Sequence, residues 1–467
     1  MIRLKQPIEL QQLFTATGVD LEFSAQEPAH PASTMLHAVQ IILENSVATL
    51  HPRFFNQNFA GADPIAIIGD WLGAALNTTN ATYEAAPIFT LMERALLKKL
   101  ASVAGIQGAE GLFCAGGSLS NLFAMHLARH RAFPEANAEG IPSQKRLVAF
   151  TSAHAHYSLK KAVALLGLGY QNLRVIPCND KGQMLPDALD TALTKSLEQG
   201  ESPFFVNATA GTTVVAGFDP IDDIARVLKQ HSTETPIWLH VDGCYGGSAL
   251  FSSAHRVLLK GVEQADSLAW NLHKMMGITQ QCSTLLVKHS GLLRSCFATG
   301  AGYLFQPDKE NADLDSGDRH FQCARRVDVL KLWLTWKYRG DKVFSERISE
   351  AVKHAVAFEE SLKRFPDQRF VMAHPRNFTN VCFWWLPPAL RGKAIEQLTQ
   401  KEWTLLHSIA PTIKRRMQEE GTAMLGFQAI DERPNFFRIL FMNPDVEAHD
   451  RQAIIDLIDR YGNEHFG

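Results

Sequence analysis

A single lysine stands where an apolar run ends in the segment LAWNLHKMMG, residues 268–277. The run has the composition of a buried strand, and open α/β sheets carry their chemistry in the crevice beyond the carboxyl ends of their strands. Lys274 is therefore a candidate reactive amine. Because a lone lysine at a strand end is usually a solvated surface residue, the rest of the chain has to supply what such an amine needs.

Three further features could serve a reactive lysine. The stretch GGS at residues 116–118 precedes an amphipathic helical pattern, and free N–H groups at a helix start bind phosphate. The strand-like HVDG ends in Asp242, whose carboxylate could pair with a buried cationic ring nitrogen. His156, in HAHYS after another apolar run, could stack on an aromatic ligand, and the nearby His154 competes for that role.

Each feature also has an ordinary structural explanation: a tight turn, a capping aspartate or a structural histidine. Together they match the requirements of one cofactor, pyridoxal phosphate (PLP), which forms a Schiff base with a lysine and pairs its pyridinium nitrogen with an aspartate. The combination therefore predicts a PLP site around Lys274 and Asp242.

The elements around these residues indicate an α/β fold. Between about residues 146 and 290, short apolar runs such as RLVAFTS and PFFVNAT alternate with helical patterns, which predicts a mostly parallel sheet covered on both faces. From Val327 the pattern changes to a long helix followed by mixed helices and strands. We expect three parts: a helical N-terminal arm at 1–64, a large PLP-binding domain at 65–330 and a small α+β domain at 331–467.

The composition excludes several classes of protein. Lys plus Arg total 46 against 48 Asp plus Glu, giving a net charge of −2, and the charges are interspersed, which argues against a nucleic-acid partner. No apolar stretch has the length of a membrane span. The seven cysteines are scattered without a CxxC pair, which argues against a disulfide framework or a zinc site. We expect a cytoplasmic protein without metal or membrane partner.

An ordered set of motifs resembles a known family. GLFCAGGSLSN, HAHYSLKKA, NATAGTTVVAGFDPI, HVDGCYGG, NLHKMMG and QCARRVDVLKLWL are similar to motifs of the group II PLP decarboxylases, which include glutamate, cysteine sulfinate and aromatic amino acid decarboxylases. HPRFFNQ, TYEAAPIFTLME, AGYLFQPDK and NFFRILFMNP resemble the glutamate and cysteine sulfinate branch. The resemblance runs from about residue 40 to the C-terminus.

The resemblance implies a fold and a set of residue roles. The fold is the PLP-dependent transferase fold (aspartate aminotransferase-like, fold type I), with a mostly parallel seven-stranded sheet, in a homodimer with active sites at the interface. Lys274 would bind the cofactor covalently, Asp242 would pair with the ring nitrogen and His156 would stack on the ring. Further cofactor contacts would be Gly117, Ser118, Thr209, Cys244, Asn271 and His273. Gln57 and Arg438 would bind the substrate.

The implied function is α-decarboxylation of an amino acid, with an acidic one (glutamate, aspartate or cysteine sulfinate) favoured by Arg438, whose planar fork suits a carboxylate. Alternatives are a decarboxylase of diaminobutyrate or an aromatic amino acid, an enzyme diverted to oxidative deamination after decarboxylation, and a catalytically silent PLP-binding interaction protein.

One loop departs from the family pattern. The family's mobile loop usually carries a tyrosine thought to protonate the reacting carbon, whereas this chain reads ENADL there, with Asn311 about where the tyrosine would be. The loop is also shorter than in the animal enzymes. Either another donor, such as His320 or a water molecule, delivers the proton, or the reaction diverts after decarboxylation.

Overall fold

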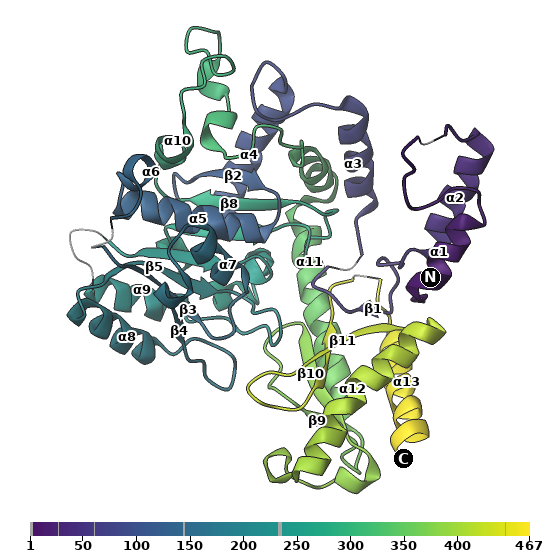
Figure 1. The fold of residues 1–467 in the computed structure, drawn as a ribbon. Coiled ribbons are helices and arrows are strands. Elements are labelled where there is room, and N and C mark those ends of the chain that lie inside the picture. The colour runs from purple at the N-terminus through teal and green to yellow at the C-terminus, as the bar shows by residue number, and fades with distance from the viewer. Residues whose placement is uncertain (1–2, 27, 60, 143–144, 232–235, 444) are drawn as a thin grey trace. The chain divides into compact units, whose positions relative to one another are not determined.

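The computed structural model contains two compact units, each with its own sheet (Figure 1). Unit 1 comprises Met1–Gly61, His354–His374 and Asn380–Gly467, and unit 2 comprises Ala62–Lys353 and Pro375–Thr379. The structure describes residues 3–26, 28–59, 61–142, 145–231, 236–443 and 445–467. Within these ranges, no helix combines the length and apolar character needed to cross a membrane.

Unit 2 contains a seven-stranded sheet of order β2-β8-β7-β6-β5-β3-β4. Its strands are β2 (Glu110–Cys114), β8 (Ser283–Val287), β7 (Ser267–Asn271), β6 (Trp238–Asp242), β5 (Ser202–Thr209), β3 (Leu147–Ser152) and β4 (Leu173–Ile176). The strands from β7 to β4 pair in parallel, and β8 pairs antiparallel with both β7 and β2. The predicted mostly parallel seven-stranded sheet is confirmed.

Burial explains why these segments form strands. All residues of β3, β6 and β7 are buried, as expected for parallel strands covered on both faces. In the register, Thr209 lies opposite Asp242, and Asp242 lies opposite Ala269. The carboxyl ends of β5, β6 and β7 therefore meet at one edge of the sheet.

Helices cover this sheet (Figure 1). The helix α5 (Gly117–Ala132) lies across strands β5 to β8, and its buried Phe123 and Leu127 belong to the same core cluster as Leu285 and Phe205. The helices are α3 (Pro64–Leu76), α4 (Pro87–Ala104), α5 (Gly117–Ala132), α6 (Ala136–Glu139), α7 (Ser158–Leu165), α8 (Pro186–Glu198), α9 (Ile221–Gln230) and α10 (Leu292–Phe297). Short 3-10 turns are η1 (Tyr170–Asn172), η2 (Gly246–Phe251), η3 (Arg256–Leu259), η4 (Val262–Gln264), η5 (Ala312–Leu314) and η6 (Gly317–Arg319).

Unit 1 contains a five-stranded sheet of order β1-β11-β12-β10-β9. The two-residue strand β1 pairs in parallel with β11, and the other pairs are antiparallel. The strands are β1 (Phe54–Phe55), β9 (Phe370–Met372), β10 (Asn380–Trp385), β11 (Met424–Gln428) and β12 (Phe436–Leu440). The other elements are α1 (Pro7–Thr15), α2 (Ala32–Asn45), η7 (Pro388–Leu390), η8 (Ile395–Gln397), α12 (Gln400–Glu420) and α13 (Ala448–Phe466). A Thr399–Glu402 capping box starts α12, and Gly421 in the left-handed region ends it.

The unit edges differ from the predicted domain edges. The expected boundary at residue 330 falls at the start of α11 (Val329–Lys363), which runs from unit 2 into unit 1. The change of pattern near Val327 therefore marks the beginning of a helix. Residues 1–61 group with the C-terminal segments because β1 adds a strand to their sheet.

Candidate active site

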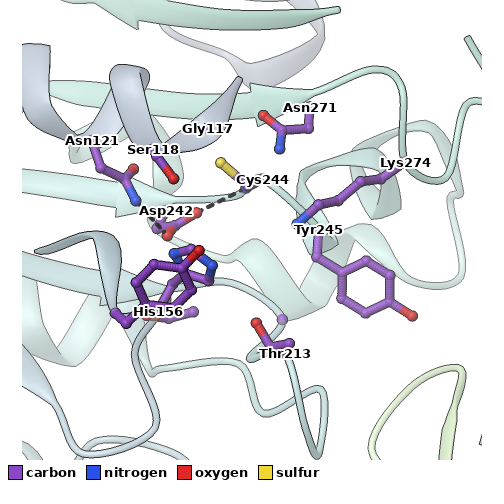
Figure 2. A pocket seen from close by; sticks show the side chains of 13 residues that line it. Gly117, Ser118, Asn121, His156, Thr213, Asp242, Cys244, Tyr245, Asn271 and Lys274 are labelled. Atoms are coloured by element: carbon purple, nitrogen blue, oxygen red, sulfur yellow. Dashed lines mark hydrogen bonds between the residues drawn. The ribbon is translucent and has the colours of Figure 1, made fainter. Parts of the chain in front are cut away.

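A pocket of about 190 Å³ lies at the carboxyl edge of the unit 2 sheet (Figure 2). Eight of the nine residues predicted to contact PLP line it: Gly117, Ser118, His156, Thr209, Asp242, Cys244, Asn271 and Lys274. Five lining residues were not predicted: Asn121, Tyr157, Gly211, Thr213 and Tyr245. Segments separated by more than 150 residues in sequence thus converge on one cavity.

The fold positions the predicted side chains through strand and helix ends. Thr209, Asp242 and Asn271 are the last residues of β5, β6 and β7. Gly117 is the first residue of α5, whose 16-residue length gives its N-terminal N–H groups a favourable field for an anion. Lys274 follows β7 by three residues, and Figure 2 shows its side chain pointing into the pocket.

The carboxylate of Asp242 is buried and well supplied with donors. Asn121 Nδ2 donates to its Oδ2 at 2.8 Å, and the Cys244 backbone N–H donates to its Oδ1 at 3.1 Å (Figure 2). Burial by itself would raise the pKa of Asp242, but hydrogen bonds from Cys244 and Asn121, together with the nearby His240, outweigh it and leave the pKa lowered. Asp242 is thus an anion suited to pair with a cationic nitrogen.

His156 presents a neutral ring at the pocket. Burial lowers its pKa, and the positive charges of Lys274 and Lys161 lower it further against the opposite effect of Asp242. The Ser158 backbone N–H donates to its Nδ1 at 3.2 Å, so the remaining ring proton lies on Nε2. His154, the competing histidine in the sequence, does not line the pocket.

Gly117 leaves room for its neighbours by lacking a side chain. A Cβ built there would lie 2.4 Å from Cys244 Sγ and 3.0 Å from Asn271 Nδ2. Burial raises the pKa of Cys244 well above its usual value, so the sulfur is a neutral thiol. The close approach of helix α5 to Cys244 and Asn271 therefore requires glycine at this position.

The turn carrying Lys274 is fixed by backbone bonds. The Lys274 N–H donates to Asn271 O at 3.2 Å, and the Gly277 N–H donates to Lys274 O at 3.1 Å. Arg347 Nε then donates to Met275 O at 3.0 Å. These bonds hold the start of the Lys274 side chain in one place while its amine remains in the pocket.

His273 is the predicted cofactor contact that does not line the pocket. Its Nδ1 lies 2.9 Å from Cys282 O and 3.1 Å from Cys282 N, so its ring is engaged with the residue that precedes β8. Burial lowers the pKa of His273 to about 4. Its predicted contact with the cofactor is not reflected in the lining of this pocket.

The two predicted substrate-binding residues both belong to unit 1. Gln57 is exposed two residues after β1, and Arg438 lies within β12 and is 8% exposed. Arg438 Nη2 donates to the carbonyl of Asn56 at 2.7 Å, which brings the guanidinium to the residue next to Gln57.

Neither Asn311, in the loop that departs from the family pattern, nor His320 lines the pocket. Asn311 has a left-handed φ of 59° and precedes the short turn η5. His320 Nε2 donates to Phe113 O at 3.1 Å, and its Nδ1 accepts from the Gln322 N–H at 2.8 Å. Since both ring nitrogens are engaged and His320 does not line the pocket, the suggestion that His320 delivers the proton is not supported.

Most unpredicted lining residues carried weak signals in the sequence. Asn121 sits four residues after Gly117, one helical turn into α5, so it follows from the predicted helix. Tyr157 and Tyr245 are each near a predicted residue in sequence, but nothing in their type distinguished a pocket side chain from a core one. Thr213 and Gly211 lie in a loop whose path the sequence did not define.

The residues present fit PLP. A lysine amine, a buried carboxylate, a neutral ring and a helix N-terminus surround one cavity of suitable size. Asn271 Oδ1, which is buried beside this cavity, has no hydrogen-bond partner among the described residues. A phosphate or ring substituent with a proton to donate would satisfy it.

Comparison with known proteins decides the family. The model of the pyridoxal-dependent decarboxylase conserved domain matches residues 17–386. The chain belongs to this family. It is therefore a PLP-dependent carboxy-lyase acting on an amino acid, as predicted, and its cofactor is PLP.

The relatives cover nearly the whole chain. Human cysteine sulfinic acid decarboxylase is 41% identical over 98% of this chain and 90% of its own length. An acidic amino acid decarboxylase of Bos taurus is 40% identical over 98% of this chain and 86% of its own length. A crystal structure of mouse CSAD is similar with a TM-score of 0.93 and 40% identity, covering 99% of this chain and 93% of that one. A structure of Oryza sativa TDC with PLP and tryptamine has a TM-score of 0.86 at 26% identity, covering 100% and 94%.

These findings confirm the resemblance to the glutamate and cysteine sulfinate branch and the fold type I architecture. The individual roles of the pocket residues remain predictions, because each follows from geometry and from the family pattern.

Proposed function

We propose that this decarboxylase removes the α-carboxylate of an acidic amino acid: cysteine sulfinate, glutamate or aspartate. The observation that carries the proposal is the similarity, over 98% of the chain, to a cysteine sulfinic acid decarboxylase and an acidic amino acid decarboxylase. Arg438 supplies a buried guanidinium that suits a carboxylate or sulfinate.

The surroundings of Arg438 within unit 1 support an anionic ligand. Lys414 Nζ donates to Asn56 Oδ1 at 2.7 Å, on the same residue whose carbonyl accepts from Arg438. Burial lowers the pKa of Lys414, and the charge of Arg438 lowers it further. Two cations held this close repel each other, and an acidic substrate group would relieve that repulsion.

We assign the following roles to the pocket residues. Lys274 holds the cofactor covalently and yields it to the substrate amine, and Asp242 keeps a proton on the pyridine nitrogen. His156 supplies a flat wall for the ring, and the N–H groups of Gly117 and Ser118 bind the phosphate. Bound PLP supplies an electron-withdrawing ring that accepts the electrons released with carbon dioxide.

Return of a proton to the substrate carbon is the step with an open assignment. Asn311 stands where the family tyrosine is expected, so diversion to oxidative deamination remains the second candidate function. Tyr157 and Tyr245 line the pocket, and the hydroxyl of Tyr245 is hydrogen-bonded to Thr379 Oγ1, which leaves Tyr157 as the candidate hydroxyl donor. An amine product would require a donor of this kind or water, and an aldehyde product would indicate the diversion.

We also propose a homodimer, as the family resemblance implies. In unit 2, helix α3 exposes an apolar face made of Ile68, Trp71, Leu72 and Leu76, and Trp71 is 70% exposed. In unit 1, helix α2 likewise exposes Leu36 and Leu43. Exposed faces of this kind mark subunit interfaces. Light scattering on the purified protein would give the mass of a dimer, and a monomer mass at micromolar concentration would contradict this proposal.

We place the reaction in the cytoplasm. All seven cysteines lie in the described ranges, where none of them forms a disulfide bond, and Cys323 is exposed. An exposed thiol without a disulfide partner suits a reducing compartment.

The test is product analysis by mass spectrometry. PLP-loaded protein is incubated separately with cysteine sulfinate, glutamate, aspartate, diaminobutyrate and tyrosine. We expect the corresponding amine from an acidic substrate, no turnover by Lys274→Ala, and a loss of about tenfold or more in kcat/KM for Arg438→Leu.

Other outcomes would redirect the assignment. If the amine comes from diaminobutyrate or tyrosine, and Arg438→Leu leaves that turnover unchanged, this substrate replaces the acidic one. Aldehyde in place of amine would establish the diverted reaction, and absence of any product would favour a catalytically silent PLP-binding protein.

A further inference from the structure

A chain of buried hydrogen bonds runs behind the pocket and ends on Asp242. Trp238 Nε1 lies 2.8 Å from Ser267 Oγ, and the same oxygen lies 2.8 Å from His240 Nδ1. His240 Nε2 lies 3.0 Å from Asn121 Oδ1, and Asn121 Nδ2 lies 2.8 Å from Asp242 Oδ2. All five residues are at most 5% exposed, so water does not compete for these bonds.

The chemistry of the two ends fixes the direction of every bond. An indole N–H can only donate, so Ser267 Oγ accepts from Trp238 and has its own proton left to give. An ionised carboxylate can only accept, so Asn121 must turn its NH₂ group toward Asp242 and its oxygen toward His240.

Only one protonation state of His240 satisfies both of its neighbours in this chain of hydrogen bonds. Its Nε2 must carry a proton to face Asn121 Oδ1, and burial lowers the pKa of His240 to about 4, so the ring is neutral despite the opposing effects of Asp242 and Ser267. Nδ1 is then unprotonated and accepts from the hydroxyl of Ser267. The bonds therefore all point from Trp238 toward Asp242.

Asn121 connects this chain to a second wall of the pocket. The other hydrogen of its NH₂ group is donated to Ser158 Oγ at 2.9 Å, and the Ser158 backbone N–H donates to His156 Nδ1. One amide in α5 thus holds both the carboxylate at the end of β6 and the residue that fixes the ring of His156. A flipped amide would present its oxygen to Asp242 and would lose the bond to that carboxylate, which can only accept.

We propose that His240 is a positioning residue that locks the Asn121 amide in the orientation that keeps Asp242 ionised and aimed at the ring nitrogen of the cofactor. This inference rests on the role proposed above for Asp242. His240 itself does not line the pocket, so it acts through Asn121.

A purely structural role for His240 makes a different prediction. Its ring stacks on Phe205 with centroids 5.7 Å apart, so the histidine also fills space in the core. His240→Phe keeps that stacking and removes both ring nitrogens. His240→Gln can place an amide N–H close to the position of Nε2 and should restore the bond to Asn121.

The experiment measures two quantities on each full-length variant. The first is the dissociation constant of PLP from the apoprotein, and the second is the 15N chemical shift of bound PLP labelled at its ring nitrogen, which reports protonation. For His240→Phe we expect about tenfold weaker PLP binding and a shift toward the unprotonated ring. For His240→Gln we expect both values to return toward those of the wild type.

Ser267→Ala provides a second test if His240→Phe fails to fold. It keeps the histidine ring but removes the donor to Nδ1, which frees the ring proton to move away from Asn121. We expect a smaller change of the same sign in both quantities. His320→Gln, which alters a buried neutral histidine outside the pocket, is the matched control and should change neither.

Two outcomes would overturn the inference and can be told apart. In the first outcome, Asp242→Asn weakens PLP binding, but the folded His240 and Ser267 variants bind PLP within twofold of the wild type with an unchanged 15N shift. The hydrogen-bond chain then has no positioning role. If Asp242→Asn also changes neither quantity, the proposed role of Asp242 itself is wrong.

Discussion

Adding one methyl group at Gly117 should damage the pocket through a contact that can be identified atom by atom. The alanine Cβ would lie 2.4 Å from Cys244 Sγ, 3.0 Å from Asn271 Nδ2 and 3.1 Å from Asn271 Oδ1. The φ of Gly117 is outside the left-handed region, so the backbone itself accepts alanine. Gly117→Ala therefore lowers the free energy of unfolding through steric overlap, and most of that overlap is with Cys244 Sγ.

The geometry sets the expected magnitude. Overpacking a tight interior site costs about 1–3 kcal/mol of unfolding free energy, and the 2.4 Å contact places this substitution in the upper half of that range. Cys244→Ala removes the sulfur and leaves the contacts with Asn271, which a shift of a few tenths of an ångström relieves. The double variant should regain about half or more of the loss, with a coupling energy of about 1–2 kcal/mol.

The coupling energy is obtained from urea unfolding of four apoproteins: the wild type, both single variants and the double variant. PLP titration of the same four proteins gives the dissociation constant of the cofactor, which shows how far the pocket is damaged. Two results would refute the reasoning. The first is an unfolding free energy for Gly117→Ala within about 0.5 kcal/mol of the wild type, which is the range typical of surface substitutions. The second is additivity of the effects of the two substitutions.

Two further predictions concern buried ionisable groups outside the pocket. Burial lowers the pKa of His320 to about 3, so its contribution to stability is present above the unfolded pKa of about 6.5 and is lost as the pH falls. In urea unfolding, His320→Gln should reduce the loss of stability between pH 7.5 and pH 5 by about 2 kcal/mol, with the exposed His449→Gln as control. Glu93 binds Arg325 Nη1 at 2.9 and 2.8 Å with both side chains almost fully buried, so Glu93→Gln should cost about 3–5 kcal/mol of unfolding free energy. Glu93→Gln combined with Arg325→Met should recover most of that loss.

Each of these predictions has a clear contrary result. An unchanged pH dependence in His320→Gln would mean that this histidine is protonated in the folded state near its usual pKa. A cost below about 1 kcal/mol for Glu93→Gln would mean that Arg325 finds another partner or water once the carboxylate is neutralised.

The sequence predicted the parallel sheet and the strand-end residues because both depend on local patterns. Buried parallel strands read as continuous apolar runs, and the polar residue that ends such a run is visible without a structure. Asp242 and Asn271 are of this kind, and Lys274 follows one of these runs by a short turn.

Features that depend on distant contacts could not be predicted in this way. The division into units depends on β1 pairing with β11, and two phenylalanines give no sign of a partner far along the chain. The orientation of the Asn121 amide depends on His240 in another strand. The exclusion of His273 from the pocket depends on its contact with Cys282, which the type and position of a histidine do not specify.

The pairing of β1 with β11 has a consequence for the synthesis of the protein. The buried Phe54 and Phe55 pair with a strand that begins at Met424, so during translation this pairing cannot form until most of the chain has left the ribosome. At typical elongation rates this delay is on the order of tens of seconds. Unit 2 is nearly continuous in sequence and can fold in that interval, whereas the N-terminal segment exposes apolar side chains throughout it. A chaperone that binds nascent chains would therefore find its substrate in the first sixty residues, and slowing translation after residue 353 would prolong that exposure.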